Sequence, residues 1–295
     1  MNALMPLAVA AALMSGAWTV AHDDPLTDPL PANPDWLKPQ TPLKIYGNTY
    51  FVGTGGLSIV LIDTGDGLIL IDGALPQTVA TTEANIRQLG FRVEDIRFIL
   101  NTEAHYDHAG GVAALARDSG AEVLTSPTGA AALRAGVVDA GDPQAGDISD
   151  SPPVPNARGV ADGSVLRLGN TAVTAVFTPG HTPGSVSWTW KSCEAETCVN
   201  VVFASSLNAV AAGTFTYTGH PELTAQLRAS IDRVEGLDCD LLISAHPDNS
   251  GGDLKIAALE AGATPNPFVD SMACRAYAER ARGRLQARLD REAAP

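Results

Sequence analysis

The sequence predicts an α/β sandwich in which two β-sheets pack face to face and helices lie outside them. Two successive passages along the chain each run from β-like segments to helical ones. In the first passage, strands and helices also alternate, which indicates an α/β layer. The chain has 295 residues and is 45% hydrophobic, enough for one large domain or two small ones with a core.

The N-terminus is typical of a signal peptide. Residues 1–21 contain no charged side chain and include the apolar run Leu7–Met14, followed by small residues and a possible cleavage site at Thr19-Val20-Ala21. A buried apolar helix is the alternative. We therefore expect export to the periplasm or the medium, an extended Pro- and Asp-rich arm over residues 22–40, and a single domain over residues 41–295. No later segment approaches the roughly 20 apolar residues that span a bilayer, so we expect no membrane association after signal removal.

The first passage begins near Leu43 with an antiparallel meander. Two glycine-containing turns, at residues 53–56 and 64–67, separate its three β-like runs. Helical and strand-like segments then alternate. The expected elements are the strands Lys44–Val52, Leu57–Ile62 and Leu68–Ile71, the helix Thr78–Leu89, the strand Ile96–Leu100, the helix Gly111–Ala116 and the strand Glu122–Thr125.

Residues 136–157 form the least periodic internal stretch. They carry several Gly and Pro residues, and a plain surface loop and a lid beside a site are equally compatible with them. The second passage follows this loop. Its expected elements are the strands Val165–Leu168, Ala172–Phe177, Val186–Trp190 and Val199–Ala204, the helix Glu222–Val234, the strand Asp240–Ser244 and a basic helix Pro267–Arg291.

The charge balance excludes one class of partner. Lys and Arg total 19 against 33 Asp and Glu, a formal net charge of −14. Phosphate backbones and anionic membrane surfaces are repelled by such a surface, so we expect no nucleic-acid partner.

Four cysteines, Cys193, Cys198, Cys239 and Cys274, suggest two disulfides in an exported chain, with three possible connectivities. We predict Cys193–Cys198, because a short polar stretch separates them between two β-like runs. We pair Cys239 with Cys274, which would join a late strand to the C-terminal helix. A zinc site made by these cysteines is the alternative, although Cys193 and Cys198 lack a second pair at matching spacing.

Histidines directly follow three apolar strands, and four of the six histidines lie there. Strand ends at one sheet edge are where loops bring side chains together. The first such loop is Glu103-x-His105-x-Asp107-His108, whose imidazoles and carboxylates are zinc ligands, and Gly110-Gly111 then allows a close backbone turn. His181 and His246 follow the other two strands. A lone histidine is more often structural, but this cluster predicts a metal site. His22 and His220 have no companion motif and are expected at the surface.

Three segments resemble the metal motifs of the metallo-β-lactamase superfamily, namely Glu103–Gly111, Thr178–Ser185 and Ala245-His246-Pro247. Ile45–Thr54 and Ser205–Ala209 are similar to subclass three of the class B β-lactamases. The resemblance covers most of the chain after Leu43. It implies an αββα sandwich with two central mixed β-sheets flanked by helices.

The resemblance also implies two zinc ions. One would be held by Glu103, His105 and His181, and the other by Asp107, His108 and His246. Glu103 departs from the family pattern, which begins with His, and it adds negative charge to the first site. An oxygen ligand also suits iron or manganese better than an all-imidazole site would, although we expect zinc.

Three further residues resemble family positions outside the ligand sets. Ser206 and Asn208 correspond to groups that bind the substrate carboxylate or a water on the second zinc; ordinary polar residues after a strand are the alternative. Asp72 resembles an aspartate that supports the metal loops, or it is a plain turn residue.

The activity implied is hydrolysis of β-lactam antibiotics, carbapenems included, by a metal-bound hydroxide that Asp107 orients. The protein would act on a small molecule as a monomer. One alternative is another hydrolase of the same fold, a thioesterase or lactonase, since fold alone does not fix the substrate. Such enzymes usually carry a metal-bridging Asp at the position of Ser206 and are commonly cytosolic. The other alternative is a periplasmic metal-binding protein without catalysis.

Overall fold

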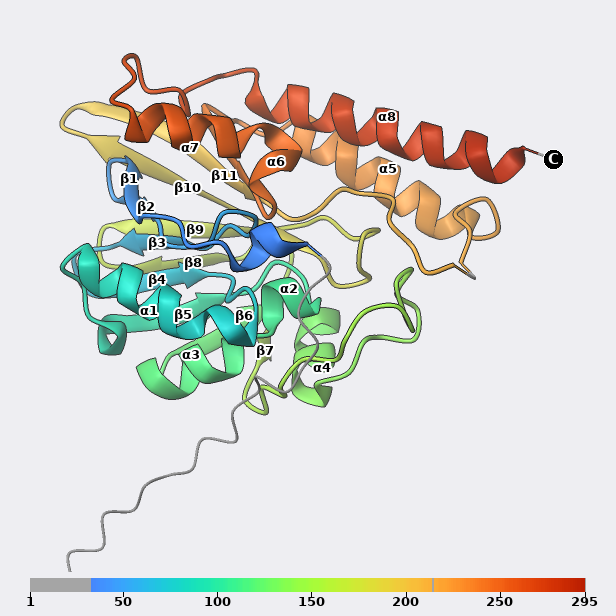
Figure 1. Ribbon diagram of the computed structural model, residues 1–295, viewed down its shortest axis with the longest axis horizontal. Coiled ribbons are helices and arrows are strands. Elements are labelled where there is room, and N and C mark those ends of the chain that lie inside the picture. Colours follow the sequence, from blue (N-terminus) through green and yellow to red (C-terminus); the bar gives the residue numbers. More distant parts are fainter. Residues whose placement is uncertain (1–32, 214, 295) are drawn as a thin grey trace, which may run out of the picture.

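The computed structural model describes residues 33–213 and 215–294, and within them it confirms the αββα sandwich (Figure 1). The predicted signal peptide, residues 1–21, and residues 22–32 of the predicted arm lie outside the described residues. In the part of the chain that is described, no helix combines the length and the apolar character needed to cross a bilayer.

The first sheet has seven strands in sequential order. Strands one to four form the predicted antiparallel meander, and the later strands add in parallel, so the sheet is mixed. Its strands are β1 (Leu43–Tyr46), β2 (Thr49–Phe51), β3 (Val60–Asp63), β4 (Leu68–Ile71), β5 (Ile96–Leu100), β6 (Glu122–Thr125) and β7 (Arg158–Gly159).

The second sheet has five strands in the order β12-β11-β10-β9-β8. All its neighbours are antiparallel except β11 and β12, which run parallel. The carboxyl ends of β9, β11 and β12 therefore meet at one edge. The strands are β8 (Val165–Leu168), β9 (Thr171–Phe177), β10 (Val186–Glu194), β11 (Thr197–Ala204) and β12 (Leu241–Ser244).

Helices cover the outer face of each sheet (Figure 1). Short 3-10 helices at Pro34–Leu37, Pro76–Thr78 and Val93–Asp95 connect several of these elements. The α-helices are α1 (Val79–Gln88), α2 (Tyr106–Ala109), α3 (Val112–Ser119), α4 (Pro127–Ala135), α5 (Pro221–Glu235), α6 (Pro247–Ser250), α7 (Gly252–Glu260) and α8 (Ala273–Ala293).

Alternation of side chains along the strands produces the layers. In β3, Val60 and Ile62 enter the core between the sheets, while Leu61 enters the core beneath α1 and α3. In β11, Phe203 faces the central core and Val202 packs against α5 and α8. Each sheet thus buries both faces, which accounts for the nearly continuous apolar runs of its inner strands.

Several predicted boundaries are wrong. The run Lys44–Val52 is two strands, because Gly47 adopts φ +51° and a Cβ there would lie 2.6 Å from a backbone oxygen of β10. The predicted helix Pro267–Arg291 begins only at Ala273. The predicted strand Leu57–Ile62 begins at Val60.

Helix α4 was not predicted, although its capping signals are present in the sequence. Ser126 caps its N-terminus by accepting a hydrogen bond from the Gly129 amide at 3.0 Å, and Pro127 occupies the first turn. Gly136 ends the helix in the left-handed conformation, at φ +69°.

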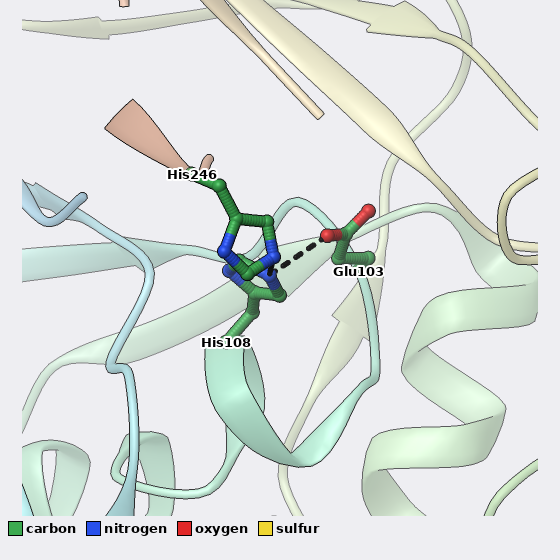
Figure 2. A group of neighbouring side chains, drawn as sticks. All are labelled: Glu103, His108 and His246. Carbon is green, nitrogen blue, oxygen red and sulfur yellow. Dashed lines mark hydrogen bonds and ion pairs between the residues drawn. The ribbon is translucent and has the colours of Figure 1, made fainter. Parts of the chain in front are cut away.

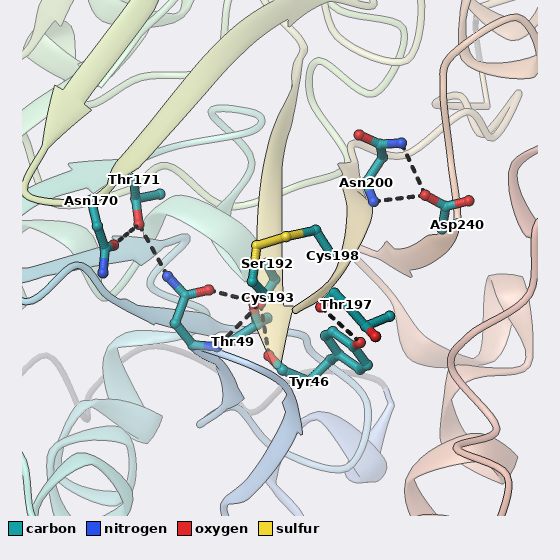
Figure 3. The surroundings of a disulfide bond; sticks show 11 residues. Tyr46, Thr49, Asn170, Thr171, Ser192, Cys193, Thr197, Cys198, Asn200 and Asp240 are labelled. Carbon is teal, nitrogen blue, oxygen red and sulfur yellow. Dashed lines mark hydrogen bonds between the residues drawn. A yellow bond between two sulfur atoms is a disulfide. The ribbon is translucent and has the colours of Figure 1, made fainter. Parts of the chain in front are cut away.

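Both predicted disulfides are present. Cys193 and Cys198 are directly opposite each other in the β10–β11 hairpin (Figure 3). Cys239 and Cys274 join the segment before β12 to α8. No free cysteine remains among the described residues, so the alternative of a cysteine zinc site is excluded for these four.

Candidate metal centre

Asp72 fixes the loop that follows β5. It lies just after β4 with no exposed surface, and its backbone is left-handed at φ +65°. Its carboxylate accepts hydrogen bonds from the Thr102 amide (2.7 Å), the Thr102 hydroxyl (2.6 Å) and the Asn101 side chain (3.1 Å). Burial raises the pKa of Asp72, partly offset by His108. The carboxylate therefore holds the start of the loop that carries Glu103 to His108, in line with the supporting role that the resemblance implies.

The loop then turns into α2 against the backbone that follows Asp72. The Gly73 amide donates to the His108 carbonyl at 2.9 Å, and the Gly111 amide donates to the Ala74 carbonyl at 2.9 Å. A Cβ on Gly111 would lie 2.2 Å from the Gly73 carbonyl oxygen, so only glycine allows this approach. The predicted close turn at Gly110-Gly111 is thus confirmed.

His105 and His181 each have one ring nitrogen engaged away from the centre. The Asp142 carboxylate lies 2.9 Å from His105 Nε2, and the Asn208 carbonyl lies 2.8 Å from His181 Nδ1. The opposite nitrogens, His105 Nδ1 and His181 Nε2, both face the Gln144 side-chain amide, at 3.5 and 3.4 Å. These two lone pairs therefore converge on one position.

His108 and His246 also each have one ring nitrogen facing an oxygen, although His108 Nδ1 makes no hydrogen bond among the described residues. The Gly56 carbonyl lies 3.3 Å from His246 Nδ1, and Asp72 Oδ2 lies 3.6 Å from His108 Nδ1. The two Nε2 atoms face each other at 3.1 Å. Figure 2 shows the two rings beside the Glu103 carboxylate. Two imidazole nitrogens at this separation repel each other unless a proton or another cation lies with them.

Glu103 is entirely buried and lies against His108. Its Oε1 is 3.0 Å from His108 Nε2 and accepts a hydrogen bond from the Ser206 hydroxyl at 2.7 Å. Its Oε2 accepts from the Ser206 backbone amide at 3.1 Å. Ligand atoms of Glu103, His108 and His246 all lie within 4.8 Å of one another. The carboxylate is thus grouped with two members of the predicted second zinc set.

Asp107 lies between the same two histidines. Its Oδ2 is 3.3 Å from His246 Nε2 and 3.4 Å from His108 Nε2, and its side chain is 14% exposed. Burial by itself would raise the pKa of Asp107, but the charge and hydrogen bond of His108 hold it well below its usual range. The carboxylate is therefore ionised at neutral pH.

The other site groups are held in complementary charge states. Burial would raise the pKa of Glu103, yet His108 and His181 keep it well below its usual range. Burial would lower the pKa of His108, but Asp107 and Glu103 raise it well above its usual value. The pKa of His181 is lowered by burial. Without a metal, a proton on His108 therefore offsets part of the negative charge of Asp107 and Glu103.

This donor set fits zinc. Each of the four imidazoles has one ring nitrogen that faces the other site residues and one that faces a carbonyl or carboxylate oxygen. Outer partners of this kind fix the orientation of histidine ligands around a metal. Two ionised carboxylates lie among them. A cation would replace the proton on His108 and relieve the contact between the two Nε2 atoms. The residues present can thus hold a metal ion.

Four residues of the group, His105, Asp107, His181 and His246, line a cleft of about 570 Å³, whereas Glu103 and His108 are buried and do not line it. Trp36 forms part of its wall, with its ring centroid 5.5 Å from that of His246. The loop of residues 136–157 contributes four lining residues, Gln144, Asp147, Ile148 and Ser149. The loop therefore lies beside the site rather than being a plain surface loop.

Other predicted residues take varied positions. Asn208 lines the cleft, and its Oδ1 has no hydrogen-bond partner among the described residues. Ser206 is 1% exposed and directs its hydroxyl to Glu103, so it does not line the cleft. Contacts of Ser206 and Asn208 with a substrate stay predictions. His220 is exposed and stacks on Phe215, as expected for a surface histidine, and His22 lies outside the described residues.

The sequence interpretation missed Trp36, Asp142 and Gln144. All three lie in segments without periodicity. The local sequence indicates only turns there, through Asn33-Pro34-Asp35 before Trp36 and through the pair Asp142-Pro143. Nothing in their local sequence points to a contact with a metal motif.

Comparisons with known proteins identify relatives of the whole domain. A model of the metallo-beta-lactamase superfamily matches residues 46–246. MEM-A1, a subclass B3 metallo-beta-lactamase from a soil metagenome library, is 49% identical with a TM-score of 0.85, covering 88% of this chain and 99% of that one. A solved structure described as the first B3 metallo-beta-lactamase with an active site glutamic acid is 47% identical, with a TM-score of 0.84, covering 92% and 100%.

Curated relatives match over a shorter region. The hydroxyacylglutathione hydrolase of Anaeromyxobacter dehalogenans is 34% identical over 143 residues, which are 48% of this chain and 42% of that protein. The matches cover between 31% and 59% of the length of five such relatives.

Proposed function

The chain belongs to the metallo-β-lactamase superfamily, and from that premise we propose that it is a zinc-dependent β-lactamase that hydrolyses the amide bond of β-lactam antibiotics. One observation carries the proposal. Four imidazoles and the carboxylates of Glu103 and Asp107 lie in one group, of which His105, Asp107, His181 and His246 line a cleft, in a chain 47% identical along 92% of its length to a B3 enzyme with an active site glutamic acid.

We assign two zinc ions to this group. Asp107, His108 and His246 would hold one ion, and His105 and His181 would hold the other together with Glu103. Glu103 Oε1 lies 3.0 Å from His108 Nε2, so this carboxylate also neighbours the ligands that we assign to the other ion. Zinc, when bound, supplies positive charge that acidifies a water molecule and polarises the lactam carbonyl.

The chain's own residues supply orientation and proton transfer. Asp107 is ionised and lines the cleft, so its carboxylate can accept a hydrogen bond from the attacking water and pass the proton toward the lactam nitrogen. The side-chain amide of Asn208 can donate to the substrate carboxylate, because its position lines the cleft beside His181. Trp36 and Ile148 provide apolar surface for the substrate and exclude water.

We also propose that the protein is exported. Export by residues 1–21 would place the enzyme in the periplasm or the medium, where the two disulfides are stable and antibiotics are met first. We propose a monomer that acts on penicillins, cephalosporins and carbapenems.

A thioesterase is the second candidate, because a hydroxyacylglutathione hydrolase matches about half of the chain. The B3 structures cover nearly all of the domain and include the glutamate, which favours the lactamase. Thioesterases of this fold usually carry a metal-bridging Asp at position 206. Here the residue is a serine that donates a hydrogen bond to Glu103, which also favours the lactamase.

The test is hydrolysis of a penicillin, a cephalosporin, a carbapenem and S-lactoylglutathione by the purified zinc-loaded protein. We expect turnover of the β-lactams, with a fall in kcat/KM of about 100-fold or more in Asp107→Ala, because it lacks the orienting carboxylate. Asp150→Asn, an exposed carboxylate on the neighbouring loop, is the matched control and should retain full activity. Turnover of the thioester alone would replace the lactamase by the second candidate.

A further inference from the structure

We propose that Asp142 is a positioning residue that holds the His105 imidazole with its Nδ1 directed at a metal ion. Asp142 lies on the loop between α4 and β7, which the sequence left as either a surface loop or a lid. The inference rests on the zinc-dependent function proposed above. It assigns this loop a part in building the metal centre.

The contact between the two side chains is short and protected from water. Asp142 Oδ2 lies 2.9 Å from His105 Nε2, and each side chain is 4% exposed. Carboxylate oxygens accept hydrogen bonds, so the Nε2–H tautomer of the neutral imidazole is the one that donates to Asp142. In that tautomer Nδ1 keeps its lone pair and is the metal-binding nitrogen.

The Asp142 carboxylate is itself held in place. Its second oxygen, Oδ1, accepts a hydrogen bond from the Gln144 backbone amide at 2.8 Å. Its backbone amide donates to the Asp139 carbonyl at 2.9 Å, which closes a turn. Oδ1 and the backbone amide of Asp142 are thus held within its own loop, which gives the carboxylate a position from which Oδ2 can orient the His105 ring.

The geometry on the far side of the ring agrees with this assignment. The side-chain amide of Gln144 donates to His105 Nδ1 at 3.5 Å and to His181 Nε2 at 3.4 Å. Gln144 Nε2 has two N–H bonds and no acceptor, so it can hydrogen-bond to both ring nitrogens when each presents its lone pair. The two lone pairs then face the same region, where an ion bound by His105 and His181 would lie.

The loop is anchored independently of His105. The Ala212 amide donates to the Pro143 carbonyl at 2.8 Å, and the Gly213 amide donates to Asp147 Oδ2 at 3.2 Å. These contacts join the loop to the segment after Asn208, whose carbonyl holds His181. We therefore expect these contacts to hold the loop in Asp142→Ala, which would separate ring positioning from loop anchoring.

A carboxylate in this position does two things for a histidine ligand. It fixes the tautomer and ring orientation, and it makes the metal-binding nitrogen more basic. Loss of such a partner commonly lowers metal affinity by about 10- to 100-fold. If Asp142 only anchored the loop, its removal would lower stability without changing the affinity for metal.

The experiment measures zinc binding to the full chain by competition with a chromophoric chelator. The proteins are the wild type, Asp142→Ala, Asp142→Asn and the control Asp150→Asn. Asp150 holds the same loop through the Val138 amide and has no hydrogen bond or ion pair with a histidine among the described residues. We expect Asp142→Ala to bind one zinc about 10- to 100-fold more weakly and the other unchanged. Asp142→Asn keeps an acceptor oxygen and should lose less, and the control should match the wild type.

A second readout follows the proton itself. In the zinc-loaded wild type, an imidazole ¹H–¹⁵N spectrum should contain a downfield Nε2–H signal from His105. The signal should disappear in Asp142→Ala and remain in Asp150→Asn. Should Asp142→Ala fail to fold, the isosteric Asp142→Asn provides the affinity comparison.

The outcomes separate this inference from the function on which it rests. Wild-type affinities for both zinc ions in Asp142→Ala, or in Asp142→Asn if only that variant folds, would overturn the role of Asp142 while leaving the lactamase proposal intact. A wild-type protein that binds no zinc would overturn the proposed function, and the positioning role with it.

Discussion

Ser206 holds the unusual carboxylate of the site, and removing its hydroxyl tests that role. The Ser206 hydroxyl and backbone amide donate to the two oxygens of Glu103, at 2.7 and 3.1 Å. Both residues are buried, with exposures of 1% and 0%. In Ser206→Ala the amide contact remains, but Glu103 Oε1 keeps only His108 Nε2, at 3.0 Å.

The expected loss follows from burial and charge. A hydrogen bond to an ionised group contributes about 1.5–3 kcal/mol, and here no water replaces it. For a domain of this size, 1 kcal/mol corresponds to roughly 2–4 °C in Tm. Ser206→Ala should therefore lower the Tm of the metal-free protein by roughly 3–12 °C.

The assay is thermal unfolding of metal-free protein followed by circular dichroism. Ser149→Ala, an exposed serine at the mouth of the same cleft, is the control and should leave Tm unchanged. The same Ser206→Ala change is repeated in a Glu103→Gln background. There the bond is neutral, and its loss should cost about 0.5–1.5 kcal/mol. Equal losses in both backgrounds, or no loss with Glu103 present, would refute the reasoning.

Three further changes test the frame around the site. Asp72→Ala leaves three buried donors, two of them on Thr102, without an acceptor, and it should lower the free energy of unfolding in urea by about 3 kcal/mol or more; a loss below about 1 kcal/mol would contradict this. Replacing Cys239 and Cys274 by serine opens a loop with a sequence separation of 35 and should cost about 4 kcal/mol in the same assay, whereas unchanged stability would oppose it. Gly180 has φ +130°, and a Cβ there would lie 2.5 Å from the backbone of α5. Gly180→Ala should therefore displace His181 and lower the amount of bound zinc measured by metal analysis. Full zinc content would argue against His181 as a ligand.

The motif residues were predictable because their order along the chain reflects the fold. A strand end followed at once by a histidine is visible in one sequence, and parallel strands bring such ends to one edge. The αββα layers and both disulfides were also predicted from local sequence signals, and the structure confirms them. Helix α4 could also have been predicted, since Ser126, Pro127 and Gly136 are cap and stop signals.

The remaining features depend on contacts between distant segments. Asp142 reaches His105 across 37 residues from an aperiodic loop, and Trp36 reaches His246 across most of the chain. The pairing of Glu103 with Ser206 and His108 depends on how β11 packs beside the loop after β5. Such side-chain contacts are set by tertiary packing, for which a single sequence carries no periodic signal.

The most direct test of the account is whether β-lactam hydrolysis requires metal at this cluster. The protein is freed of metal with a chelator, dialysed, and titrated with zinc while hydrolysis of a penicillin and a carbapenem is followed. The account predicts no turnover in the metal-free protein and recovery that saturates at two zinc ions per chain. Turnover that persists after metal analysis shows the zinc to be gone would contradict it.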